Sequence, residues 1–397
     1  MSFVLQGLAA GYPWNALLSS TDYYRKQLNE TASLATLEAV LSLTYVTTNL
    51  IGFAWLNRPF AVTESLSREL GYIRVFYYLN IVTFSLLCVS PWLPRQVSQD
   101  HGLFAVVVVA GGILGLTSAF FQHAIFAIAA RIGPAMTRAY LLGFAFAGTL
   151  ASAAAMITRS FADKKETAAY NFGLTLGCLL IGYLVFACRH TSSHVQDQDT
   201  PPSSLVDEMD VSAGMETLNP DIAETKIDSP AGLRKALLVI ALALAGTLLV
   251  FPALIASFKP VSDNQDVHEF TSILFLFFNL GDLAGRGLAV GLSRLSANAL
   301  LVVVVFRTLS LSFFAFCNRD EEAPSDDDLY LSDTSVIALV FFQGAMSGAL
   351  FAAAAALAPT HKPSDPGKAG KMVAATIAVA LAAGALGGTV LVSAIDV

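Results

Sequence analysis

The chain contains eleven apolar runs, and each is long enough to cross a lipid bilayer as an α-helix. They cover residues 2–20, 34–56, 70–92, 103–129, 136–158, 169–188, 233–256, 268–292, 298–316, 334–358 and 370–394. With 55% hydrophobic and only 13% charged residues, the chain is too apolar for a water-soluble globule. The sequence therefore predicts an all-α integral membrane protein with eleven transmembrane helices.

A polar segment, residues 190–232, separates the first six runs from the last five. Its nine acidic residues and single lysine give it a charge of −8, although the net charge of the whole chain is only −7. Such a segment cannot bury enough apolar surface to fold alone, so we expect a disordered linker. The predicted organisation is a six-helix bundle at 1–189, the acidic cytosolic linker at 190–232 and a five-helix bundle at 233–397, which is typical of a transporter.

The basic residues favour a cytosolic N-terminus and an extracellular C-terminus. In that orientation thirteen lysines and arginines lie on the cytosolic side and eight on the outer side. The first run lacks a basic leader and a cleavage site, so we expect it to span the membrane and not to be a signal peptide. The sequon Asn29-Glu30-Thr31 then falls in the first outer loop, where it is either a glycosylation site or a chance match.

Soluble-enzyme chemistry has no support in the sequence. The four cysteines, Cys88, Cys178, Cys188 and Cys317, lack the paired spacing of disulfides or metal ligands. The sequence also contains no phosphate-binding glycine loop with its lysine and no zincin motif. We therefore expect no enzyme activity, no metal and no other cofactor.

The run 268–292 carries three polar residues near its middle, Asn279, Asp282 and Arg286. An ionised side chain at the centre of a spanning helix costs about 2.5–3.5 kcal/mol, so it is kept where it faces protein, water or substrate. Positions three and four apart share one face of a helix, so these residues form a single polar stripe. The alternative is an ion pair that only neutralises itself, and we favour a substrate site because ionisable groups inside membranes generally mark function.

Other polar residues interrupt the apolar runs. Asn15 follows Trp14 in the first run, where the indole either belongs to the aromatic belt of the interface or faces the interior. Ser118 and Gln122 share a helix face in the fourth run and could instead serve only as helix-to-helix hydrogen bonds. Arg307 lies near the middle of the ninth run, at the depth of Asp282, and needs a further acceptor such as a backbone carbonyl.

Glycines four residues apart recur in both halves of the chain and would let neighbouring helices approach closely. These pairs are Gly111/Gly115, Gly173/Gly177, Gly281/Gly285, Gly344/Gly348 and Gly384/Gly388. Their recurrence suits helices that move against one another.

Three stretches resemble motifs of the equilibrative nucleoside transporter family. FFNLGDLAGRGLA is similar to its helix-eight signature, GYPWNALLSSTDYY to its helix one, and SAFFQHAIFAIAARIGP to its helix four, with Gln122 matching the family glutamine. Arg74, Arg307 and the helix after Lys368-Ala369-Gly370 also align in kind. The chain departs from the family where an acidic residue shortly before that Ala-Gly is usual, so a cytoplasmic gate between such an acid and Arg74 is not predicted here.

The resemblance implies facilitated diffusion of nucleosides such as adenosine, inosine and uridine, and sometimes of nucleobases. It implies a two-bundle fold like that of major facilitator transporters without a twelfth helix, working as a monomer in the plasma membrane, with no nucleic-acid partner. Asp282 would bind the ribose, Gln122 the edge of the base, and Trp14 its face. The full predicted substrate-binding set is Trp14, Asn15, Leu18, Gln122, Asn279, Asp282 and Arg286, with Arg74 and Arg307 in a gating or structural polar network.

Three alternative functions remain open at this point. A major-facilitator carrier for sugars or drugs predicts twelve helices. Proton coupling through Asp282 is possible because mid-membrane carboxylates often relay protons, although Arg286 one turn away opposes it. A receptor or scaffold would bind the ligand without moving it.

Overall fold

The computed structural model of the chain describes residues 3–20, 23–24, 34–56, 66–92, 102–159, 164–196, 228–262, 266–292, 294–317 and 331–395. Within these ranges all regular elements are helices. The longer ones are α1 (Phe3–Ser19), α3 (Leu34–Leu56), α4 (Leu66–Val89), α6 (Gly102–Ile132), α7 (Pro134–Arg159), α8 (Lys164–Gln196), α9 (Pro230–Val250), α11 (Val267–Leu292), α12 (Ala297–Ser310), α13 (Asp333–Leu357) and α14 (Pro366–Ile395). The short ones are α10 (Ala253–Ala256) and the 3₁₀ helices η1 (Ser90–Trp92), η2 (Leu311–Phe316) and η3 (Ala358–His361).

In the part of the chain that the structure describes, nine helical segments are long and apolar enough to cross a membrane. α1, with 17 residues, and the apolar stretch of α3, Val40–Leu56, are shorter. The predicted all-α membrane fold is thus confirmed, and each predicted run coincides with a helix where it is described. The count of eleven spans stays a prediction.

Two of the predicted helices are interrupted near their C-terminal ends. The run 233–256 was expected to form one helix, but α9 ends at Val250 and the chain turns before α10, because Pro252 has no N–H and its ring clashes with the preceding turn. The run 298–316 changes from α12 to the tighter η2 at Leu311.

The predicted linker is described only at its two ends. α8 continues to Gln196 because no glycine or proline stops it, and α9 begins at Pro230. Residues 197–227 of the linker and the sequon at Asn29 lie outside the described residues.

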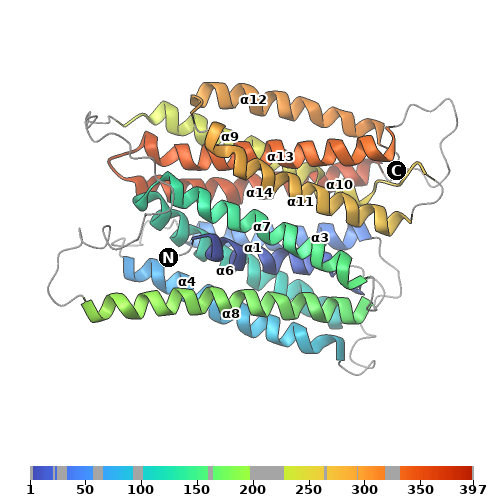
Figure 1. Cartoon of the computed structure of the whole chain (residues 1–397), viewed down its shortest axis with the longest axis horizontal. Coiled ribbons are helices and arrows are strands. Elements are labelled where there is room, and N and C mark those ends of the chain that lie inside the picture. The colour runs from blue at the N-terminus through green and yellow to red at the C-terminus, as the bar shows by residue number, and fades with distance from the viewer. Residues whose placement is uncertain are drawn as a thin grey trace.

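The helices form two halves that lie against each other, α1 to α8 in one and α9 to α14 in the other (Figure 1). In the first half α1 packs along α7 and α3 along α6, and in the second α9 packs along α14 and α11 along α13. The long helices of each half therefore pair in the same order, first with fifth and second with fourth, as in the structural repeats of transporters. α7 on α11 and α6 on α14 join the halves.

The axes of all long helices are roughly aligned, so the bundle has two ends (Figure 1). We call one of them the linker end, where α4 begins at Leu66, α8 ends at Gln196 and α9 begins at Pro230. α1 begins on this side, and α14 ends on the opposite side (Figure 1). Termini on opposite sides are what an odd number of spans requires.

Glu69 of α4 fastens the two halves together at the linker end. Its carboxylate accepts hydrogen bonds from both terminal nitrogens of Arg131 in α6, at 2.6 and 3.0 Å, and lies 3.1 Å from the ammonium of Lys371 in α14. The Glu69 side chain is only 3% exposed. Because Lys371 belongs to the second half, this buried carboxylate links α4 and α6 to α14.

α11 and α13 approach closely because glycines line both of their facing surfaces. A Cβ atom on Gly281 or Gly285 would overlap the carbonyl oxygen of Phe341 or Ala345, and one on Gly344 would overlap the carbonyl of α11 opposite it. The close approach predicted for these glycines is confirmed. It places the polar stripe of α11 directly beside α13.

The same prediction is wrong for α8. A Cβ on Gly173 or Gly177 would have no neighbour within 4 Å. This face of α8 points away from the other helices, so glycine spacing alone does not identify a packed surface.

Replacing Gly344 by leucine should disrupt the folded protein, because the new side chain would displace α11 from α13. We expect most of the monodisperse peak to be lost in fluorescence-detected size-exclusion chromatography. Gly177→Leu is the matched control and should keep the peak. Equal yields for the two variants would contradict the close contact.

Candidate functional site

A cavity of about 150 Å³ lies between the two halves, roughly ten times the ~15 Å³ that one water molecule needs. α1, α3, α6 and α7 line it from the first half, and α9, α11, α13 and α14 from the second. Six of the predicted substrate-binding residues line this cavity: Trp14, Asn15, Gln122, Asn279, Asp282 and Arg286. The structure therefore brings together helices that are far apart in the sequence.

The other three predicted residues do not line the cavity. Leu18 is buried in α1, one turn beyond Trp14. Arg74 is exposed on α4 and lies five residues beyond the buried Glu69 that joins the halves. Arg307 of α12 is 1% exposed and lies behind the cavity wall.

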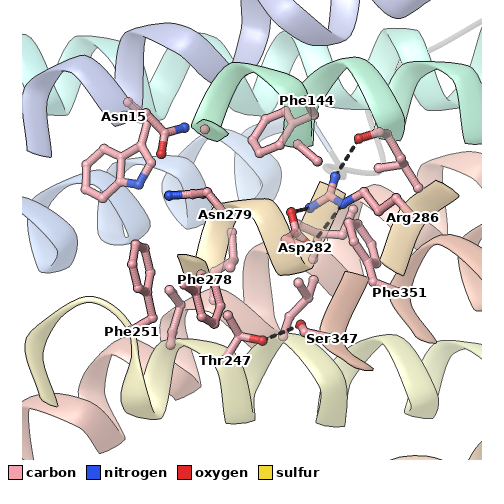
Figure 2. Close-up of a pocket in the computed structure, with 18 of the residues that line it drawn as sticks. Asn15, Phe144, Thr247, Phe251, Phe278, Asn279, Asp282, Arg286, Ser347 and Phe351 are labelled. Carbon is pink, nitrogen blue, oxygen red and sulfur yellow. Dashed lines mark hydrogen bonds and ion pairs between the residues drawn. The ribbon is translucent and has the colours of Figure 1, made fainter. Parts of the chain in front are cut away.

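Asp282 and Arg286 face the cavity from α11, one helical turn apart (Figure 2). The Nε of Arg286 donates to one carboxylate oxygen of Asp282 at 3.2 Å, and a terminal nitrogen lies 2.8 Å from the other. The remaining terminal nitrogen donates to the carbonyl of Leu141 in α7, at 2.8 Å. Arg286 therefore binds both Asp282 of its own helix and α7 of the opposite half.

Two aromatic rings hold the guanidinium of Arg286 in place. Its central carbon lies 5.6 Å from the ring centroid of Phe144 in α7 and 5.2 Å from that of Phe351 in α13, within the range of cation–π attraction. Each carboxylate oxygen of Asp282 has two lone pairs, and Arg286 uses one on each. The rest are available to a ligand in the cavity, since the Asp282 side chain is 14% exposed.

Asn279 joins α11 to α7 on another wall of the cavity. Its amide nitrogen donates to Ser152 at 3.0 Å and to the carbonyl of Phe275 at 2.9 Å, while Thr149 donates to its backbone carbonyl at 3.0 Å. The side chains of Asn279 and Asn15 point toward each other (Figure 2). Both hydrogens of the Asn279 amide are used in these bonds. Its side chain can therefore bind a ligand only through the oxygen, as an acceptor.

Aromatic side chains give the cavity flat apolar walls. Trp14 packs on Tyr45, with ring centroids 4.5 Å apart, and Phe251 stacks on Phe278 at 4.4 Å with an interplanar angle of 8°. Sequence reasoning missed Phe251, Phe278 and Tyr45, because an aromatic residue inside an apolar run carries no signal that separates a cavity wall from a lipid-facing surface.

Three buried polar atoms in the cavity wall have no hydrogen-bond partner among the described residues. They are the side-chain oxygen of Gln122 and the hydroxyls of Tyr140 and Ser42. An unpaired buried polar group costs about 1–3 kcal/mol, so a ligand that bonds to these atoms would recover that energy. The role predicted for Gln122 stays a prediction, and Tyr140 and Ser42 are further unpaired groups in the same wall.

The family model described as nucleoside transporter matches residues 106–393, well over half of the chain. This chain belongs to the nucleoside transporter family. The match contains Gln122, Asp282 and Arg286, whereas Trp14 and Asn15 precede it. The resemblance read from the sequence motifs is confirmed, and membrane transport of nucleosides is the function of this protein.

Among solved structures, the chain is similar to the proton:xylose symporter XylE of the major facilitator superfamily, determined with 6-bromo-6-deoxy-D-glucose bound. The TM-score is 0.62 at 12% identity, and the match covers 99% of this chain and 87% of the symporter. At such low identity the likeness shows the fold alone. The predicted major-facilitator-like architecture is confirmed.

Proposed function

We propose that this protein is a uniporter that carries nucleosides such as adenosine, inosine and uridine, and nucleobases, down their concentration gradients by alternating access. The observation that carries the proposal is the position of the cavity, which residues of both halves line. A rocking of one half against the other would expose such a site to each side of the membrane in turn. Glu69 would hold the linker end closed in the state seen here.

The nucleoside would be bound from two sides. Asp282 would accept hydrogen bonds from ribose hydroxyls, and Gln122 of α6 would bond to the edge of the base. The rings of Trp14, Phe251 and Phe278 would pack on the faces of the base, with stacking worth about 1–3 kcal/mol.

The proposal assigns a role to each part of the chain. Residues 1–189 and 233–397 would be the two moving bundles, and 190–232 a cytosolic linker between them. The N-terminus would lie in the cytosol and the C-terminus outside, in a monomer of the plasma membrane without enzyme activity and without a nucleic-acid partner. The bias of basic residues supports this orientation.

The ion pair argues for uniport over proton coupling. Asp282 is the only carboxylate among the described residues that line the cavity, and Arg286 already pairs with it. A coupled carrier needs an acid that can bind and release a proton during the cycle.

Counterflow in proteoliposomes tests the proposal. Vesicles loaded with unlabelled uridine should take up labelled uridine transiently above its external concentration, and neither an imposed pH gradient nor a Na⁺ gradient should drive accumulation. A panel of nucleosides, nucleobases and sugars as competitors then defines the substrate class. Binding without counterflow would indicate a receptor, and accumulation driven by either gradient would refute uniport.

Shortening the linker should leave uptake close to that of the wild type. Deleting residues 204–217 keeps a segment that still spans up to about 60 Å. The equally long deletion 216–229 is the control. It removes Ser229, whose N–H donates to the carbonyl of His361 at 2.8 Å, and Asp228, which accepts from Ser364, so uptake per surface transporter should fall. Loss of uptake in the first deletion at normal surface expression would contradict the linker assignment.

Gln122→Ala should change the ranking of bases and leave the requirement for ribose intact. The amide that bonds to the base edge is lost, so the ratio of inhibition constants for inosine and uridine should shift about three- to tenfold. Ser118→Ala is the control, because Ser118 shares this face of α6 but does not line the cavity. Competition against labelled uridine measures both, and an unchanged ratio in Gln122→Ala would remove Gln122 from the base site.

A further inference from the structure

Two hydroxyl groups, of Thr247 in α9 and Ser347 in α13, line the same cavity as Asp282 and bond to each other (Figure 2). Their oxygens are 2.5 Å apart. A Cβ atom on Gly348 would lie 2.7 Å from a carboxylate oxygen of Asp282, so the residue next to Ser347 touches that carboxylate. The α11–α13 contact therefore puts the Ser347 hydroxyl and the Asp282 carboxylate on adjoining parts of one wall.

Arg307 organises this hydroxyl pair from behind the wall. One of its terminal nitrogens donates to the carbonyl of Ala243 at 2.9 Å, and the other donates to the Thr247 hydroxyl at 3.1 Å. A guanidinium has no acceptor, so the Thr247 oxygen receives this bond. Arg307 was expected to need a further acceptor, and the Ala243 carbonyl and the Thr247 hydroxyl are such acceptors.

The single proton of the Thr247 hydroxyl goes to the Ala243 carbonyl, to which it donates at 2.7 Å. The Thr247 oxygen therefore accepts hydrogen bonds from its two other partners, Arg307 and the Ser347 hydroxyl. Because the proton of Ser347 is held by Thr247, the Ser347 oxygen acts toward the cavity as an acceptor.

We propose that Ser347 is a second ribose-binding residue, which accepts a hydrogen bond from one ribose hydroxyl while Asp282 accepts from the other, and that Thr247 and Arg307 are its positioning residues. Two separate acceptors in one cavity fit a ring with two hydroxyls, because each hydroxyl has one proton to donate. This inference rests on the proposed binding of the ribose at Asp282. It predicts that the 2′- and 3′-hydroxyls of a ribonucleoside are read by different residues.

The affinity of the purified protein for its ligand tests the assignment. It is measured as the ligand concentration at which the rise in unfolding temperature is half-maximal. Ser347→Ala should weaken uridine binding about three- to tenfold. Of the two analogues 2′-deoxyuridine and 3′-deoxyuridine, one lacks the hydroxyl that Ser347 binds. The variant should bind that analogue as tightly as the wild type does. Equal weakening of uridine and both analogues, or no weakening at all, would overturn the assignment.

Variants of Thr247 test the positioning role. Thr247→Val should reproduce the selective loss of Ser347→Ala, and Thr247→Ser, which keeps the hydroxyl, should restore wild-type selectivity. Thr308→Val is the matched control on α12, because the Thr308 hydroxyl is exposed and bonds to its own helix. Wild-type selectivity in Thr247→Val would overturn the positioning role of Thr247 and Arg307. Because binding is measured without transport, a protein that binds uridine but shows no counterflow would refute the proposed uniport and not this assignment.

Discussion

Asp282→Asn should remove most nucleoside uptake and also lower the stability of the transporter. The amide cannot pair with Arg286, whose side chain is only 7% exposed, and breaking a buried ion pair from one side costs about 3–5 kcal/mol. The loss of a charged acceptor for the ribose should weaken binding a further tenfold to hundredfold, about the worth of a hydrogen bond to a charged group. Initial uptake rates normalised to surface expression, together with the unfolding temperature of the purified variant, measure the two effects.

A double variant separates the two roles of this carboxylate. Asp282→Asn with Arg286→Gln replaces the ion pair by two neutral amides, so no charge is left unpaired in the membrane. We expect the yield and the unfolding temperature to recover while uptake stays low. If uptake recovered together with stability, the pair would be structural and the ribose assignment would be wrong.

Arg286→Lys should reduce uptake at least about tenfold although it conserves the charge. The guanidinium contacts both oxygens of Asp282 and the carbonyl of Leu141 at once, and it lies over the rings of Phe144 and Phe351. An ammonium is a point charge on a flexible stem and cannot reproduce this planar set of contacts. Uptake kinetics across a range of uridine concentrations measure the loss.

Lys371→Arg is the matched control at the linker end. There the ammonium pairs with one carboxylate oxygen of Glu69, a contact that a guanidinium can also make. This exchange should leave uptake near that of the wild type. Wild-type uptake in Arg286→Lys would show that the charge alone is sufficient and that the planar contacts do not matter.

The sequence could predict those parts of the site that depend on local geometry. The helical period places Asn279, Asp282 and Arg286 on one face, and the cost of charge in a membrane directs that face inward. The resemblance to family motifs added Trp14 and Gln122 at positions that the structure brings to the same cavity. The nature of the fold followed from the length and number of the apolar runs.

Other parts of the site depend on packing between distant helices and left no readable pattern. Thr247 and Ser347 are single hydroxyl residues in apolar runs, and only the contact of α9 with α13 brings them together. Glu69 was missed because a lone acid at a helix start is usually solvated, whereas α6 and α14 bury it here. Pro252 did carry a signal, since proline within a predicted helix marks a break.

The glycine-lined contact of α11 with α13 has a mechanical consequence. Backbone lies against backbone along this seam, so few long side chains are available there to adjust as one helix slides past the other. Shear between packed helices takes place through such side-chain adjustments. The two helices should therefore behave as one stiff plate that carries the carboxylate, the guanidinium and the serine hydroxyl as a fixed set. The relative movement of helices during a transport cycle would then have to take place at the edges of this plate. These edges are the contacts of α11 and α13 with α7 and the contact of α13 with α9.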